Sequence, residues 1–141
     1  MAIPSHLRLE IVTPDRHVVR DEVDEVEVPG SEGYFGVLPG HTPLLASLQV
    51  GVLWYRKGSE KFYLSIAFGF AEVLPDRVTI LAQIAERAEE IDTSRAEAEK
   101  KQAEQLMTGR APDPEELERA RISMFKALVR LRVATRARTR R

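Results

Sequence analysis

The sequence changes its hydrophobic period near residue 85, and this change constrains the fold more than any other feature. Before it, apolar and polar residues alternate in short runs, as in residues 7–11 and 23–28, and turn-forming residues separate the runs at intervals of about 8–12 residues. This pattern predicts an all-β sandwich or barrel. A parallel sheet is excluded because its crossover helices would not fit between the runs.

The residues after 84 have the composition of two helices. Residues 92–107 contain no Gly or Pro and many strong helix formers. After a Gly- and Pro-containing loop, Asp113 suits a helix N-cap and Pro114 the first helical position. We therefore predict an antiparallel hairpin of helices 92–107 and 113–136. The expected domains are a β-sandwich over 1–86 and a helical hairpin over 87–141.

The second helix carries two apolar stripes. One stripe consists of Leu117, Ala120, Met124, Leu128 and Leu131, and the other of Ile122, Phe125, Val129 and Val133. The first helix offers mostly small residues, including Ala96, Ala103 and Leu106, so it can cover only one stripe. The other stripe packs either on the sandwich or on another protein, because leaving it in water would forfeit about 1.5–3 kcal/mol per side chain.

Charge is divided sharply along the chain. All 22 acidic residues lie at or before Glu118, and only basic charges follow it. The basic residues after Glu118 are Arg119, Arg121, Lys126, Arg130, Arg132, Arg136, Arg138, Arg140 and Arg141. This asymmetry predicts that the tail meets an acidic surface, which could belong to another protein, to a nucleic acid or to the chain's own body.

Several classes of site and location are disfavoured. The chain has no cysteine, which excludes disulfides and thiolate metal sites. Its histidines, His6, His17 and His41, are scattered and show no metal-ligand spacing. No apolar run approaches the ~18 residues that span a bilayer, and the first residues do not resemble a signal peptide. We expect a soluble cytoplasmic protein without a metal.

The stretch GYFGVLPGHTPLLASL, residues 33–48, closely resembles the signature of the epsilon subunit family of F-type ATP synthases. The resemblance continues in GVLWYRKG, FYLSIAFGFAEVLPDRVTILA, EEIDTSRAEAEKKQAE and LVRLRVA, and covers nearly the whole chain. It implies an N-terminal two-sheet β-sandwich followed by a C-terminal antiparallel two-helix hairpin. That fold agrees with the prediction made from the residues alone.

The resemblance also implies a function. Family members are non-catalytic rotor subunits on the cytoplasmic face of the bacterial inner membrane, where the sandwich holds the gamma subunit and touches the c-subunit ring. Ser31, Glu32, Gly33, Tyr34 and His41 match positions that form these contacts. Many relatives carry an acid where Tyr34 stands, so a charge pair is not implied at that position.

The hairpin has a regulatory role in the family that the chain resembles. It folds down on the sandwich or extends along gamma, and in the extended form its basic helix approaches the beta and alpha subunits and inhibits ATP hydrolysis. The resemblance assigns this contact to Arg119, Lys126 and Arg130. The charge division and the two apolar stripes are what such a two-state element would require.

Some family members bind ATP in the hairpin, and the IDTSRA sequence at 91–96 resembles their motif. The matching positions here are Glu86, Asp92, Arg95, Lys126 and Arg130. Gln102 and Lys126 stand where ATP-binding relatives carry arginine, and Gln102 removes a charge. The resemblance thus implies no required cofactor and at most a weak regulatory ATP. The alternative is that Asp92 caps a helix and Arg95 is a solvated helix residue.

The sequence gives weaker support to two other functional classes, a nucleic-acid-binding module and an enzyme. A nucleic-acid-binding module could use Arg119, Lys126 and Arg130, which line one side of a helix. Against it, Phe125 is the only aromatic residue of the tail, and the acidic body would repel phosphate. An enzyme is disfavoured because no nucleophile–base pair, carboxylate pair or phosphate loop stands out.

Overall fold

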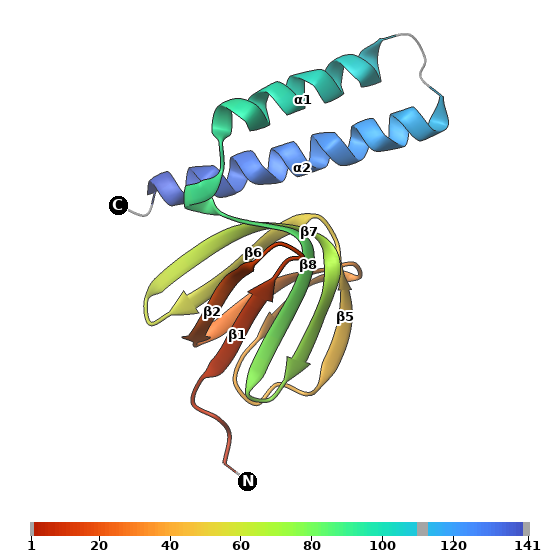
Figure 1. The fold of residues 1–141 in the computed structure, drawn as a ribbon. Helices are drawn as coiled ribbons and strands as arrows, with labels where there is room; N and C mark the ends of the chain where they lie inside the picture. Colours follow the sequence, from red (N-terminus) through yellow and green to blue (C-terminus); the bar gives the residue numbers. More distant parts are fainter. Residues whose placement is uncertain (1, 110–112, 140–141) are drawn as a thin grey trace. The chain divides into compact units, whose positions relative to one another are not determined.

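The computed structural model describes residues 2–109 and 113–139. The chain separates into two compact units, Met1–Arg87 and Ala88–Arg141. The first consists of β-strands and the second of helices (Figure 1).

Eight strands make up the first unit. They are β1 (Leu7–Val12), β2 (His17–Val23), β3 (Glu25–Gly30), β4 (Gly33–Val37), β5 (Leu44–Leu48), β6 (Gly51–Lys57), β7 (Glu60–Leu74) and β8 (Arg77–Arg87). The strand order is β2-β1-β8-β7-β5-β3-β4, and β6 pairs with both β3 and β7. Only the β1–β8 pair is parallel among the strand pairs of the described residues.

The long strand β7 connects the two layers of the sandwich. Residues 60–66 pair with β6, and residues 69–73 pair with β5. Between these two segments, Phe68 and Gly69 have positive φ angles of 60° and 133°. A Cβ atom on Gly69 would lie 2.0 Å from the backbone oxygen of Leu81, so the bend requires glycine.

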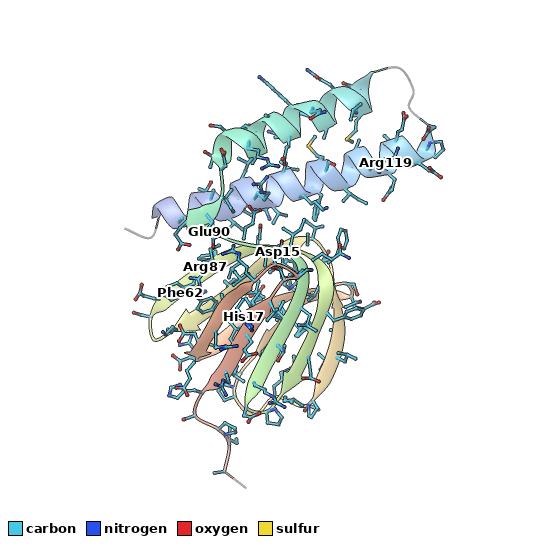
Figure 2. All side chains as sticks on the ribbon, in the orientation of Figure 1. Asp15, His17, Phe62, Arg87, Glu90 and Arg119 are labelled. Atoms are coloured by element: carbon cyan, nitrogen blue, oxygen red, sulfur yellow. The ribbon has the colours of Figure 1, made fainter. Side chains whose placement is uncertain are left out.

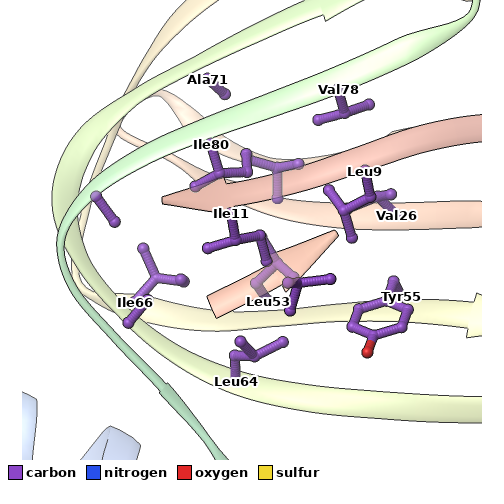
Figure 3. Close-up of a cluster of buried hydrophobic side chains, with 14 of the residues drawn as sticks. Leu9, Ile11, Val26, Leu53, Tyr55, Leu64, Ile66, Ala71, Val78 and Ile80 are labelled. Carbon is purple, nitrogen blue, oxygen red and sulfur yellow. The ribbon is translucent and has the colours of Figure 1, made fainter. Parts of the chain in front are cut away.

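Apolar and polar residues alternate along the strands, so one side of each strand faces the core. Leu7, Leu9 and Ile11 of β1 have no exposed area, while the intervening Arg8 is exposed. The other strands contribute in the same way, and Figure 3 shows a part of the resulting cluster. Its labelled members are Leu9, Ile11, Val26, Leu53, Tyr55, Leu64, Ile66, Ala71, Val78 and Ile80. The predicted β-sandwich is therefore confirmed.

The second unit consists of a short 3₁₀ turn, η1 (Ala88–Glu90), and two helices, α1 (Thr93–Thr108) and α2 (Pro114–Thr139). Asp92 caps α1 by accepting the backbone N–H of Arg95 at 3.1 Å. Asp113 accepts the N–H of Glu116 at 2.8 Å at the start of α2. Both caps satisfy backbone donors that have no partner within the helix. The helical hairpin of the predicted fold class is confirmed.

Small side chains set the contact between the two helices. The buried alanines are seven residues apart on each helix, namely Ala96 and Ala103 of α1 and Ala120, Ala127 and Ala134 of α2. One surface groove places Ala103 beside Ser123 and Lys126, and another places Ala134 beside Thr93 and Ser94. The helices are therefore antiparallel, and small residues at the contact allow them to approach closely.

The apolar residues of the hairpin are buried to different extents. Leu106 lines a groove with Ser123 and Lys126 of α2 but stays 54% exposed, and Leu128 of the first expected stripe is 41% exposed. Buried alanines spaced by seven lie at the contact, and Leu131 of the first expected stripe lines a groove with Thr93 and Ser94 of α1. In the other stripe Phe125 is 49% exposed, whereas Val129 and Val133 are buried. Within the described residues, neither helix has the length and apolarity needed to cross a membrane.

Candidate functional sites

A surface groove of about 480 Å³ lies at one end of the sandwich unit, between the β3–β4 turn and β5. Residues 30–35 and 44–47 line it. The turn is fixed to β5 because Ser31 N–H donates to the carbonyl oxygen of Ser47 at 2.8 Å and the two serine hydroxyls are also hydrogen-bonded. Gln49 adds a bond from its side-chain amide to the carbonyl oxygen of Gly30 at 2.8 Å.

Tyr34 is held in this groove by its hydroxyl group. The backbone N–H of Val52 donates to the Tyr34 hydroxyl at 2.9 Å, while 49% of the residue stays exposed. Gly51 makes this approach feasible, since a Cβ atom there would lie 2.4 Å from the Tyr34 hydroxyl oxygen. A rigid aromatic ring with an exposed face is typical of a protein contact.

The structure brings together four of the five residues expected to contact partners. Ser31, Glu32, Gly33 and Tyr34 all line the groove. His41 is not among the lining residues. It follows Gly40, and its backbone N–H donates to the carbonyl oxygen of Leu38 at 3.1 Å.

The exposed row of Leu45, Phe70 and Leu81 adjoins the groove through Leu45 and was not found by sequence analysis. These side chains are 72%, 57% and 55% exposed. Phe70 of β7 pairs directly with Leu81 of β8 and with Ser47 of β5, and Leu45 lies two residues before Ser47 on the same face. The three residues thus form one apolar patch across three strands, which is a feature of protein interaction sites.

The basic residues expected to form the inhibitory contact have different surroundings on α2. Arg119 is exposed near the start of the helix (Figure 2). Lys126 lines a groove of about 330 Å³ together with Glu99, Gln102, Ala103, Leu106 and Ser123. Arg130 is only 14% exposed and donates to Glu99 at 3.0 Å.

The residues expected to bind ATP are partly occupied by other contacts. Asp92 is the cap of α1, and Arg95 donates from Nε to Glu99 at 3.1 Å. Arg130 binds the other oxygen of the same carboxylate. Glu86 belongs to β8 of the sandwich unit, where it pairs with Ser65. The spacing of Arg95 and Glu99 by four residues was a detectable signal, but the link to Arg130 was not.

The clearest electrostatic perturbation lies at the junction of β2 and β3. The Gly58 backbone N–H donates to Asp24 at 2.7 Å and, with a bond from His6, lowers the pKa of the Asp24 carboxyl below its usual 3.8. A hydrogen bond to Asp21 raises the pKa of Lys57. These contacts fix strand ends. In the described part of the chain, no cluster of three His, Asp or Glu residues is placed to hold a metal ion.

Two family descriptions match successive parts of the chain. Residues 6–88 match "ATP synthase, Delta/Epsilon chain, beta-sandwich domain", and residues 89–135 match "ATP synthase, Delta/Epsilon chain, long alpha-helix domain". The chain is 52% identical to the ATP synthase epsilon chain of Herpetosiphon aurantiacus, over 95% of this chain and 98% of the relative. It is 47% identical to ATP synthase epsilon chain 2 of Syntrophotalea carbinolica, over 92% of this chain and 94% of the relative.

The fold also resembles a chain in a solved assembly. A chain of the Euglena gracilis mitochondrial ATP synthase, in a structure of OSCP, F1 and the c-ring, superposes with a TM-score of 0.80. The match covers 99% of this chain and 84% of that chain at 24% identity. Taken with the two family matches and the curated relatives, these similarities establish that the chain belongs to the family of ATP synthase Delta/Epsilon chains.

Proposed function

We propose that the chain is a non-catalytic central-stalk subunit of a bacterial, proton-translocating F-type ATP synthase. It transmits rotation of the c-ring to the catalytic head. The observation that carries this proposal is the match to epsilon chains of ATP synthases along nearly the whole length of both proteins. We infer that the chain lies at the cytoplasmic face of the inner membrane, attached through its partners.

The sandwich unit supplies the surfaces for the rotor. The exposed row of Leu45, Phe70 and Leu81 is an apolar surface that suits the gamma subunit, and Phe70 in the middle strand is its expected anchor. The groove with Ser31, Glu32, Gly33 and Tyr34, and the bend at His41, suit further contacts with gamma or the c-ring. Both surfaces are held by strand pairing, so they are preorganised for binding.

The hairpin unit supplies the restraint on ATP hydrolysis. Its second helix is basic after Glu118 and exposes Phe125 and Leu128. A basic helix with exposed apolar side chains suits an acidic groove on the beta and alpha subunits, where Arg119, Lys126 and Arg130 would make the charged contacts. Opposite charge steers the encounter, and the apolar side chains add affinity.

Reconstitution of the catalytic head tests both roles. ATPase activity of a head complex of alpha, beta and gamma is measured with the full chain and with a chain that ends at Thr108. We expect the full chain to inhibit and the shortened chain to bind without inhibiting. Equal inhibition by both chains would refute the hairpin's role, and failure of both to bind gamma would refute the stalk assignment.

A pair of substitutions tests the proposed gamma surface. Phe70→Asp puts a charge at the centre of the exposed row, so we expect it to weaken binding to gamma about a hundredfold, as the loss of an interface anchor does. Ser59→Asp, in the exposed β6–β7 turn, is the matched control and should bind as the unmodified chain does. Equal binding by all three chains would show that gamma uses another surface.

A further inference from the structure

One carboxylate joins the two helices of the hairpin. Glu99 of α1 accepts from Arg95 of the same helix through Oε1 at 3.1 Å. Its other oxygen, Oε2, accepts from Arg130 of α2 at 3.0 Å. Each oxygen of Glu99 is thus bound by a guanidinium group, and the two groups come from different helices.

A third cation lies near this carboxylate. Lys126 precedes Arg130 by one helical turn and lines the same groove as Glu99 and Gln102. Guanidinium N–H groups that converge on one site are the donors that proteins use for phosphate. Arg95, Lys126 and Arg130 would therefore form an anion-binding cluster, and here the anion is a side chain of the protein.

The arrangement does not fit the nucleotide that the family resemblance implies. Glu99 already accepts one N–H from each guanidinium, so a phosphate group would have to share Arg95 and Arg130 with this carboxylate. The Glu99 carboxylate would also repel a phosphate brought within a few ångströms. Gln102, in the same groove, contributes no compensating charge.

We propose that Glu99 is the resident anion of the hairpin. Its carboxylate takes the place of a phosphate group between Arg95 and Arg130, so that α1 and α2 are held together without nucleotide. The anion site is latent, and it becomes available to a polyphosphate only when the charge of Glu99 is removed. The hairpin of this chain is consequently insensitive to ATP.

The decisive experiment measures binding to the full chain by equilibrium dialysis, with ATP and inorganic tripolyphosphate as probes. Glu99→Gln removes the charge and keeps the size of the side chain, so we expect both probes to bind it at least about tenfold more tightly than the unmodified chain. Glu97→Gln makes the same charge change at an exposed position of α1. This control should bind as weakly as the unmodified chain does.

Three results would overturn the proposal. They are no gain in binding by the Glu99→Gln chain, an equal gain in the Glu97→Gln chain, and ATP binding without tripolyphosphate binding, since the site recognises phosphate charge.

A measurement on the unmodified chain tests the proposal even if the Glu99→Gln chain does not fold. The side-chain Nε–H signals of Arg95 and Arg130 are followed by NMR while ATP is added to millimolar concentration. We expect no saturable shift, and a saturating shift at submillimolar ATP would overturn the proposal. Neither test involves gamma or the catalytic head, so failure here leaves the stalk assignment intact, and failure of the stalk assignment leaves this result unaffected.

Discussion

The sandwich and the hairpin are stabilised by different kinds of contact. In the sandwich, large branched side chains such as Leu9, Ile66 and Ile80 are wholly or almost wholly buried, and each contributes about 1.5–3 kcal/mol by area. In the hairpin, the helices meet through alanines and through the bridge from Glu99 to Arg130. An alanine methyl group contributes only about 0.8 kcal/mol on the same scale.

Because the two units are stabilised by different contacts, we expect them to differ in local stability. Stability is distributed unevenly along many proteins, and the elements that move belong to the less stable part. We expect a helix pair that meets largely through small side chains and one ion bridge to open more readily than the sandwich. A core formed by eight strands cannot do so without unfolding.

The largest expected effect is in the sandwich core. Ile80→Ala removes three carbon atoms from a side chain with no exposed area, so the free energy of unfolding should fall by about 2–5 kcal/mol. Leu81→Ala is the control, because the neighbouring side chain on β8 is 55% exposed and should change stability by no more than about 0.5 kcal/mol. Urea unfolding followed by Trp54 fluorescence measures both, and equal losses would contradict the assigned faces of β8.

A smaller effect is expected at the contact between the helices. Ala103→Leu forces a larger side chain against Ser123 and Lys126 of α2, which should destabilise the hairpin by about 1–3 kcal/mol. Ala98→Leu changes the same helix at an exposed position and serves as the control. Amide hydrogen exchange of α1 and α2 measures the opening, and unchanged protection in the Ala103→Leu chain would show that the helices do not meet there.

The ion bridge should contribute less than the packing around it. Because Glu99 is 39% exposed, the coupling between Glu99→Gln and Arg130→Gln in a double-mutant cycle should be about 0.5 kcal/mol. Hydrogen exchange at low salt measures the free energy of opening the hairpin in the unmodified chain, the two single variants and the double variant. The coupling should shrink at high salt because screening weakens exposed charge pairs. A coupling of zero at low salt would show that the bridge does not stabilise the hairpin.

The smallest expected effect concerns acid stability of the sandwich. Folding lowers the pKa of Asp24 below 3.8, so the stabilising increment is fully present above pH 3.8 and disappears as the pH falls through the lower folded value. Asp24→Asn should remove this increment, so the free energy of unfolding should fall slightly less steeply with decreasing pH in the acid limb of a plot against pH. Asp15→Asn, in an exposed turn, should leave the limb unchanged, and an identical limb in the Asp24→Asn chain would contradict the assignment.

Local patterns predicted the elements of both regions. Alternation in residues 7–11 and 23–28 depends only on neighbouring residues, as do the helix caps at Asp92 and Asp113. The exposed row of Leu45, Phe70 and Leu81 was not predictable because it depends on the register of β5, β7 and β8. Each of these residues alone reads as an ordinary strand residue.

Long-range contacts explain the other differences. Glu99 and Arg130 lie on different helices, so their pairing depends on the stagger of α1 against α2. The same stagger places the buried alanines at the helix contact and leaves Leu128 exposed. A stripe drawn on a single helix shows which residues share a side, but it does not show which side the neighbouring helix covers.

The parallel pairing of β1 with β8 has a consequence for synthesis of the protein. Leu9 pairs with Val78 and Ile11 with Ile80. The first strand of the unit, β1, therefore cannot complete its pairing until the last strand, β8, has been synthesised. Folds dominated by such distant pairings form slowly, because the entropy of closing a long loop is lost before the stabilising contacts form. On the ribosome, the core of this unit can close only after β8 has left the exit tunnel, and until then its apolar strands stay exposed to aggregation.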